Sequence, residues 1–235
     1  MPSAARVLAC ALALGLLLSG CGGSAGVVSP TGVDELQIPT QSPDPGDFVD
    51  VVDNPWLPLA PGSSWTYDVV GDASSTAARA VVRVLPDTAV VAGVATTQVR
   101  TVVEDAAGRT LRSGVASYAQ DRAGNVWLFG EGTGPGAWRA GENGALAGLA
   151  MPAHPRVGDG YLREKAVVAE ERTRVWSLDA GQVVDGTSFD GLLYVETTSL
   201  KQAGSARQWY LRGRGLLLAD LTGSVGAERW TLVDP

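Results

Sequence analysis

Apolar and polar residues alternate with a period of two in several stretches of the chain. In the first of these, Trp65, Tyr67 and Val69 alternate with Thr66 and Asp68. The same alternation separates Ala80, Val82 and Val84 from Arg79 and Arg83, Val99, Thr101 and Val103 from Gln98 and Arg100, Trp209 and Leu211 from Gln208 and Tyr210, and Trp230 and Leu232 from Arg229 and Thr231. This pattern predicts strands of an antiparallel sheet, with one face in a core and the other in water.

Helices are not favoured anywhere in the domain. The best helical candidate, ENGALAGLAMP at 142–152, is short and interrupted by glycine. Three prolines in NPWLPLAPG exclude a helix where the domain begins, because proline lacks the backbone donor that a helix interior needs. The sequence therefore predicts an all-β or nearly all-β single domain.

Two predicted turns share the frame Asp-x-Ala-Gly. It occurs at Asp105–Gly108 and again at Asp121–Gly124, each time between β-rich stretches. An aspartate can accept hydrogen bonds from the backbone of its own turn, and glycine supplies the left-handed residue of a hairpin. Both frames are interpreted as structural turns, and Asp121→Asn is expected to cost little stability because asparagine keeps an acceptor.

The stretch YAQDRAGNVWLFGE at 118–131 also raises the possibility of a metal loop. A calcium loop of the EF-hand type that started at Asp121 would need an oxygen ligand at its third position, glycine at its sixth and glutamate at its twelfth. Those positions hold Ala123, Val126 and Gly132. No metal ligand is therefore predicted.

The N-terminal residues are typical of an export signal. An apolar run, VLACALALGLLLSG, follows Arg6 and is short for a membrane span. It ends in Leu18-Ser19-Gly20-Cys21, which resembles the bacterial lipobox. The resemblance implies a lipoprotein signal peptide at 1–20 and lipid attachment at Cys21. An ordinary signal peptide with an incidental cysteine is the alternative.

Composition divides the remainder into a tether and a domain. Residues 21–47 are rich in Gly, Ser, Pro, Thr and Asp and are predicted to be a flexible tether, with a partly ordered arm as the alternative. Residues 48–235 are predicted to form the single β domain. Extracytoplasmic localisation, with lipid anchoring to the cell membrane, follows from these assignments.

Charge and cysteine content exclude several classes of function. Without segment 1–20, the chain keeps 17 basic and 25 acidic side chains, a net charge of −8. Such a balance opposes nucleic-acid binding, so membrane attachment would depend on the lipid. The chain has two cysteines, Cys10 in the signal and Cys21 at the lipobox, so no thiol remains for catalysis, for a metal or for a disulfide.

No catalytic residue and no cofactor site is predicted. His154 is the one histidine, and no G-x-S-x-G motif is present to place a nucleophilic serine. Paired carboxylates leave a surface hydrolase of glycan or ester as an alternative. The carboxylates that could form such a pair are Glu131, Asp159, Glu164, Glu170 and Glu171.

The chain also has seven tryptophans, most of them at strand positions that predict a core role. Trp138 lies beside the Gly-Pro loop of FGEGTGPGAW and is the best candidate for a ligand-facing ring. Packing against the loop or the core is the alternative for this residue.

Three segments carry a resemblance to a family. NPWLPLAPGSSWTY, QWYLRGRGLLLAD and YAQDRAGNVWLFGE resemble uncharacterised secreted proteins and lipoproteins of bacteria with P-L-x-P-G-x-x-W-x-Y and W-Y-x-x-G-x-G-L segments. The plan is more distantly similar to LolA-like envelope carriers. This similarity implies an antiparallel meander forming a curved sheet or half-barrel, whose apolar concavity can hold an acyl chain.

The expected function is therefore non-enzymatic. A membrane-anchored lipoprotein would bind a lipid, another amphiphile or an envelope partner through its β domain. A surface hydrolase and a purely structural or protein-binding module remain the alternatives.

Overall fold

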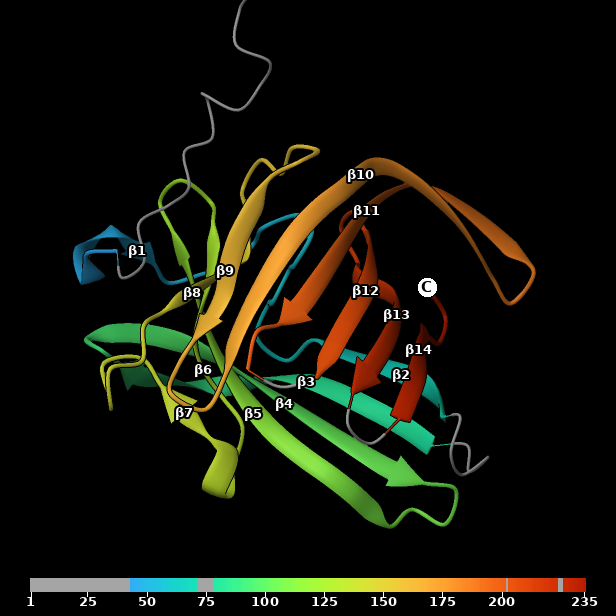
Figure 1. Cartoon of the computed structure of the whole chain (residues 1–235), viewed down its shortest axis with the longest axis horizontal. Coiled ribbons are helices and arrows are strands. Elements are labelled where there is room, and N and C mark those ends of the chain that lie inside the picture. Colours follow the sequence, from blue (N-terminus) through green and yellow to red (C-terminus); the bar gives the residue numbers. More distant parts are fainter. Residues whose placement is uncertain (1–42, 72–77, 202, 224–225) are drawn as a thin grey trace, which may run out of the picture. The chain divides into compact units, whose positions relative to one another are not determined.

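The computed structural model describes residues 43–71, 78–201, 203–223 and 226–235 (Figure 1). The predicted signal peptide, Cys21 and all but the last five residues of the predicted tether lie outside the described residues. The chain divides into two units, Met1–Gln37 and Ile38–Pro235, and every described residue belongs to the second unit.

Strands make up most of the described residues. The strands are β1 Phe48–Val49, β2 Ser64–Gly71, β3 Ala78–Val91, β4 Val94–Asp105, β5 Thr110–Asp121, β6 Val126–Glu131, β7 Trp138–Arg139, β8 Gly148–Met151, β9 Gly160–Lys165, β10 Glu170–Val184, β11 Thr187–Ser199, β12 Gly204–Leu211, β13 Gly215–Gly223 and β14 Gly226–Leu232. Two short 3-10 turns, η1 Pro45–Asp47 and η2 Gly134–Gly136, accompany them. Within the described ranges, no helix is long and apolar enough to cross a membrane.

All fourteen strands belong to one open, curved sheet in which the pairs are antiparallel. Its order is β7-β6-β5-β4-β3-β2-β14-β13-β12-β11-β10-β9, with β1 added to β5 and β8 added to β6. The path consists of two meanders that meet where β2 pairs with β14, in a register that includes Tyr67 with Leu232. The predicted fold class, an antiparallel meander forming a curved sheet, is confirmed.

Curvature brings the two meanders face to face. Figure 1 shows the long strands β10 and β11 arching above β2 to β5. One core cluster includes Trp127, Leu128 and Met151 from the first meander and its β8 branch together with Leu193 from the second. The apolar interior therefore lies inside the curve, between strands that are distant in sequence.

The predicted alternation holds in β2, β3 and β14, but not at every position. Gln98 of β4, expected in water, is only 8 % exposed. Its amide donates to Thr96 Oγ1 at 2.7 Å, and its carbonyl accepts from Ser117 Oγ at 3.2 Å. These bonds satisfy the buried amide, so a polar residue can occupy an interior position at modest cost.

β8 fills the gap between β6 and β9. It pairs with β6, and just before it the N–H of Leu146 donates to the carbonyl of Lys165 at 2.9 Å. A Cβ atom built at Gly148 would overlap the carbonyl oxygen of Arg163. Glycine is therefore required here, because the backbones of β8 and β9 approach each other closely beside Arg163.

Both Asp-x-Ala-Gly frames are hairpin turns, as predicted. The backbone N–H of Gly108 donates to the Asp105 carbonyl, and that of Gly124 donates to the Asp121 carbonyl, both at 2.9 Å. The two glycines have φ values of 77° and 88°. Their left-handed conformation agrees with the sequence interpretation.

Asp121 has more partners than a turn aspartate needs. Its Oδ1 accepts from the backbone N–H of Asn125 at 2.9 Å. Its Oδ2 accepts from Trp127 Nε1 at 2.8 Å and from Asn125 Nδ2 at 2.9 Å. Asparagine keeps an acceptor but would turn its amide towards one of these donors, so the structure favours a larger cost for Asp121→Asn than the small one expected from the sequence.

We predict that Asp121→Asn lowers the free energy of unfolding by about 1–3 kcal/mol, because one buried donor must then face the new amide. Urea unfolding measures the change. Asp105→Asn is the matched control, since one Asp105 oxygen accepts both backbone N–H groups of its turn and the other faces the exposed Arg109. If Asp121→Asn and Asp105→Asn lowered the free energy of unfolding equally, the hydrogen bond from Trp127 Nε1 to Asp121 Oδ2 would not have the stabilising role assigned to it.

Candidate functional site

A cavity of about 180 Å³ lies inside the curve of the sheet and is lined from both meanders. Its walls are mainly apolar and aromatic, and one end is polar. The lining includes Leu57, Trp65, Tyr67, Val82, Ala116, Tyr118, Glu131, Arg163, Gln208, Tyr210 and Leu216. The cavity is thus a partly open space of amphipathic character.

All three segments that carry the family resemblance meet at this cavity. The backbone N–H of Gly213 donates to the carbonyl of Pro55 at 2.6 Å, and Tyr67 Oη donates to the carbonyl of Leu216 at 3.0 Å. The third segment contributes Tyr118 and Glu131 to the lining. The segments read from sequence as turns and strands therefore also build the walls of one site.

The strand face of Gln208 and Tyr210 differs from the sequence expectation. Alternation placed both side chains in water, opposite Trp209. Instead both line the cavity, while Trp209 stacks on Tyr194 with ring centroids 4.9 Å apart. The polar face of β12 is turned towards the inside because the sheet curves around it.

Arg163 is the centre of the polar end. Its Nη1 donates to Glu171 Oε2 at 2.7 Å, and its Nη2 donates to Glu131 Oε2 at 3.2 Å. Glu164 Oε2 lies 4.0 Å from Nη1. The Arg163 side chain is 21 % exposed, so it lies in a largely enclosed position. There its guanidinium faces the carboxylates of Glu131, Glu164 and Glu171.

A bulge in β9 explains how neighbouring residues reach the same cluster. β10 residues Glu171 and Arg172 pair with Glu164 and Leu162, so Arg163 is an extra residue in β9. Strict alternation would direct Arg163 and Glu164 to opposite faces, whereas a bulge re-aims side chains locally. The bulge thus lets both residues interact with Glu131 and Glu171.

Electrostatics in the cluster favour a charged arginine and a protonated Glu164. Burial raises the pKa of Glu164 to about 7, with a further increase from Glu131 and a partial decrease from Arg163. Burial would lower the pKa of Arg163, but Glu131 and Glu171 outweigh it and hold that pKa well above its usual value. Glu164 is therefore the member of the cluster that changes charge near neutral pH.

Tyrosines surround the guanidinium. Burial raises the pKa of Tyr118, Tyr161 and Tyr210, in the last case to about 12, and Arg163 lowers each pKa in part. Their hydroxyls therefore stay protonated at physiological pH. The Tyr161 hydroxyl is buried and has no hydrogen-bond partner among the described residues.

A second, more polar space adjoins the cavity. It has a volume of about 410 Å³ and shares Glu131, Arg163 and Gln208 with the cavity. Its lining includes the hydroxyl residues Thr197, Ser199, Ser205 and Thr222. Taken together, the two spaces reach the size of small-ligand sites, which is about 300–1,000 Å³.

The structure separates the five carboxylates that the sequence singled out. Glu131, Glu164 and Glu171 meet at Arg163, as described above. Asp159 instead lies 3.7 Å from Arg156 across a turn, and Glu170 lies 3.8 Å from Lys201. Arg163 itself was missed, because a lone arginine in a strand looks like any solvated residue.

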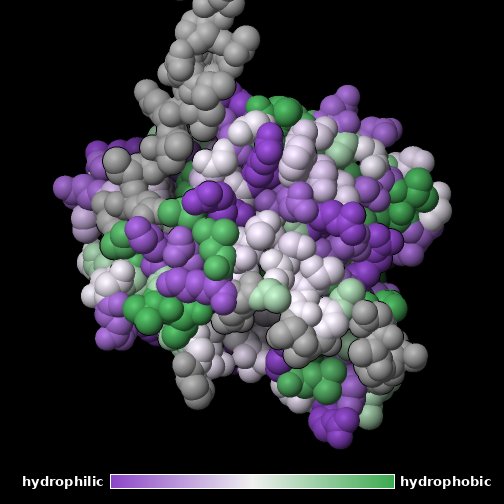
Figure 2. All heavy atoms as spheres, in the orientation of Figure 1, coloured by the Kyte–Doolittle hydropathy of each residue, from purple (hydrophilic) through white to green (hydrophobic). Residues whose placement is uncertain are grey.

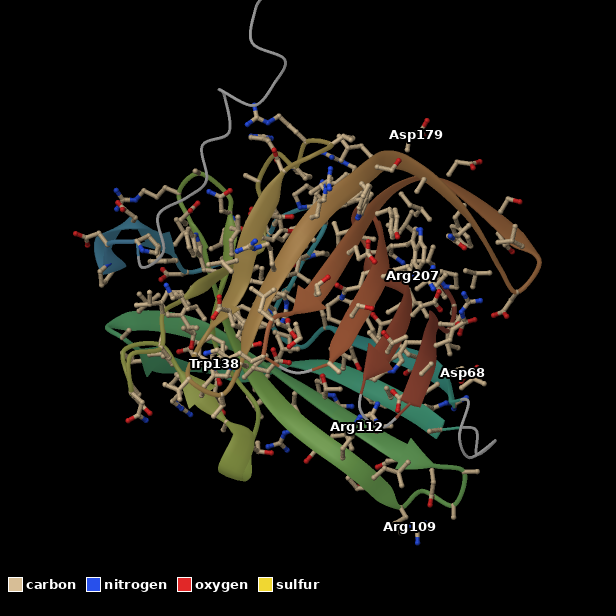
Figure 3. The ribbon with its side chains drawn as sticks, viewed as in Figure 1. Asp68, Arg109, Arg112, Trp138, Asp179 and Arg207 are labelled. Carbon is tan, nitrogen blue, oxygen red and sulfur yellow. The ribbon has the colours of Figure 1, made fainter. Side chains whose placement is uncertain are left out.

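Trp138, predicted to face a ligand, lies at one end of the sheet beside β6, away from Arg207 and Asp68 (Figure 3). Trp138 is 7 % exposed and lines a separate pocket of about 350 Å³ with Ala166 and Val167. Its Nε1 makes no hydrogen bond of good geometry among the described residues, although the indole N–H lowers the pKa of Glu164 slightly. Its role towards a ligand stays a prediction.

On the face of the molecule viewed in Figure 2, the described residues form small, separate hydrophobic groups and no broad apolar area. These groups lie between hydrophilic residues and an area of intermediate hydropathy (Figure 2). Exposed ion pairs such as Arg79 with Asp68, at 3.4 Å, belong to this outer surface and contribute little to stability.

Comparisons with known proteins show the fold at most. No protein-family model and no curated protein matches the chain. Among solved structures, it is similar to a candidate exported protein with a YmcC-like fold from Bacteroides fragilis NCTC 9343, with 15% identity over 75% of this chain and 96% of that one and a TM-score of 0.46. It is also similar to a candidate lipoprotein from Parabacteroides distasonis ATCC 8503, with 13% identity over 78% of this chain and 98% of that one and a TM-score of 0.41. At these scores the similarities identify neither a ligand nor an activity.

We predict that Glu164 destabilises the folded protein above neutral pH. Its folded pKa of about 7 exceeds the ordinary value of 4.5, so between these values the folded state holds a proton that the unfolded state has lost. The unfolding free energy therefore falls as pH rises through this window, by an amount on the order of 2–3 kcal/mol.

Glu164→Gln should match the wild type near pH 4, below the ordinary pKa of 4.5, and be more stable near pH 8, as measured by urea unfolding at both pH values. Glu142→Gln, at an exposed loop position outside the cluster, controls for the loss of one negative charge. A constant difference between Glu164→Gln and wild type at both pH values would contradict the assignment.

Proposed function

We propose that this protein is an extracytoplasmic lipoprotein, anchored to the membrane through Cys21, that binds an amphiphilic small molecule inside its curved sheet. Residues 1–20 would be removed as the signal peptide, residues 21–47 would tether the domain, and residues 48–235 would hold the ligand. The role is non-enzymatic: the protein carries or senses its ligand.

The observation that supports this proposal best is the junction of an apolar cavity with a polar space at Arg163. Trp65, Tyr67 and Tyr210 offer aromatic walls on one side of the junction, and Thr197 and Gln208 offer polar groups on the other. A molecule with an apolar part and a polar part fits such an arrangement. Apolar walls with a few placed polar groups are usual in small-molecule sites.

Burial of the apolar part would supply the affinity. At about 25 cal/mol per Å² of apolar surface, covering on the order of 100 Å² contributes about 2–3 kcal/mol without any catalytic group. The polar end would then select among amphiphiles, because a mismatched headgroup leaves buried polar groups unpaired.

A hydrolase is the second candidate, favoured by the pKa of about 7 at Glu164 beside Glu131 and Glu171. Carboxylates whose environments separate their pKa values can act as acid and base. Arg163 opposes this role, however, since its two hydrogen bonds hold the carboxylates that would have to act as base or nucleophile. Binding is therefore the better-supported function.

We predict that the purified protein binds single-chain amphiphiles with ten-carbon tails below their critical micelle concentration and that tryptophan emission changes on binding. Trp65 lines the cavity, so Trp65→Phe should remove much of the change. Trp176, 44 % exposed on β10 beneath Arg174, is the matched control, and Trp176→Phe should keep the change. Calorimetry on both variants separates loss of signal from loss of binding.

Two outcomes would count against the site. A signal that follows Trp176 and not Trp65 would place the ligand outside the cavity. Binding of no amphiphile would favour the protein-binding module, and hydrolysis of a glycan or ester that depends on Glu164 would favour the enzyme.

Membrane anchoring has its own prediction. Cys21→Ser removes the thiol that would carry the lipid, so the variant should leave the membrane fraction or accumulate as an uncleaved precursor. Fractionation of cells followed by mass spectrometry of the N-terminal peptide measures both. A processed Cys21→Ser protein that stays in the membrane would overturn the anchor.

A further inference from the structure

We infer that the polar end of the cavity selects an amphiphile with a positively charged amine headgroup and disfavours one with a carboxylate or phosphate headgroup. This inference deepens the proposed function and rests on it. It is carried by the arrangement of charged groups around Arg163.

Negative groups outnumber positive ones at the junction. Glu131, Glu164 and Glu171 surround the single guanidinium of Arg163 within 4.0 Å. Arg163 carries one positive charge, whereas Glu131 and Glu171, which both accept from it, carry one negative charge each. A surplus of negative charge therefore remains at the junction. An ammonium group placed here would meet uncompensated carboxylate, whereas an anionic headgroup would meet repulsion.

At the polar end of the cavity, an anion would have to compete with carboxylates for Arg163. The Arg163 nitrogens that face the cluster donate to Glu171 and Glu131. The other basic side chain in the lining, Arg214, is exposed and keeps its positive charge, because it donates through Nη2 to the neutral carbonyl of Asp234 at 2.7 Å, but among the described residues it forms no ion pair with the carboxylates around Arg163. An acid headgroup would have to displace a carboxylate before it could bind Arg163.

Two buried polar groups near the cluster have no hydrogen-bond partner among the described residues, although neither side chain lines the cavity or the polar space. The Tyr161 hydroxyl lies within the field of Arg163 and has an oxygen that can accept from an ammonium. The indole N–H of Trp138 acts on Glu164 without completing a hydrogen bond.

The amine headgroup makes binding depend on pH in a defined direction. The groups that face Glu164 are Glu131 on β6, Trp138 on β7, Arg163 on β9 and Glu171 on β10. Burial and its carboxylate neighbours keep the pKa of Glu164 near 7, so this side chain gains its negative charge between pH 6 and pH 8. A cationic ligand should therefore bind more tightly as pH rises through this range, and an anionic ligand less tightly.

The experiment uses three amphiphiles with the same ten-carbon tail: decylammonium, decyl glucoside and decanoate. Calorimetric titration of the purified protein at pH 8 should give decylammonium at least a tenfold tighter Kd than decanoate. For decylammonium, Kd should tighten several-fold between pH 6 and pH 8. Tighter binding of decanoate or decyl glucoside would overturn the headgroup assignment and leave the amphiphile site standing, whereas binding of none of the three would remove the site itself.

Variants connect the preference to the cluster. Glu164→Gln should abolish the pH dependence for decylammonium while keeping the site occupied. Glu131→Gln combined with Glu171→Gln frees Arg163 and should reverse the preference towards decanoate. Glu170→Gln is the matched control, because Glu170 adjoins Glu171 but pairs with Lys201 outside the cavity.

The measurements on the unaltered protein decide the matter even where the double variant does not fold. An unchanged preference for decylammonium in a folded double variant, or a pH dependence that Glu164→Gln leaves intact, would contradict the inference.

Discussion

The pairing of β2 with β14 is the constraint on which the remaining architecture depends. Most other neighbours in the sheet are close in sequence, so each meander can form from local hairpins, whereas β2 and β14 join opposite ends of the domain. Once Tyr67 pairs with Leu232, the two meanders share one sheet, and its twist and curvature direct their inner faces towards each other. Tyr67 also donates to the carbonyl of Leu216, so the residue that joins the meanders is itself a wall of the cavity.

Desolvation of the charged groups at the polar end of the site lowers the stability of the fold, and burial of apolar side chains elsewhere offsets this loss. Desolvating charged groups is unfavourable, and breaking a buried ion cluster leaves an uncompensated charge. Arg163 is retained among Glu131, Glu164 and Glu171 although an apolar core would be easier to stabilise. Local departures from the simplest packing occur most often where function requires them, and the bulge at Arg163, the raised pKa of Glu164 and the close approach at Gly148 all lie at this position.

How far the sequence predicts this structure depends on the range of the interactions involved. Alternation identified β2, β3, β4, β12 and β14, and turn chemistry identified Asp105–Gly108 and Asp121–Gly124, because both patterns are local. Alternation could not show that the Gln208 and Tyr210 face would curve inward, since period two distinguishes two faces without saying what covers each. It also failed at Gln98, whose partners Thr96 and Ser117 become visible only when β4 and β5 are paired.

The charge cluster lay beyond sequence reasoning for the same reason. Glu131, Glu164 and Glu171 were recognised as carboxylates of interest, but so were Asp159 and Glu170, and nothing local distinguishes the two sets. The distinction arises from β8, which fills the gap between β6 and β9 and so brings Glu131 to the strand that carries Arg163 and Glu164. Gly148 permits that approach, because any side chain there would collide with the Arg163 carbonyl. In the sequence, Gly148 only interrupts a candidate helix. In the structure, the absence of its side chain allows β8 to lie against β9, and this close approach lets Glu131 reach Arg163.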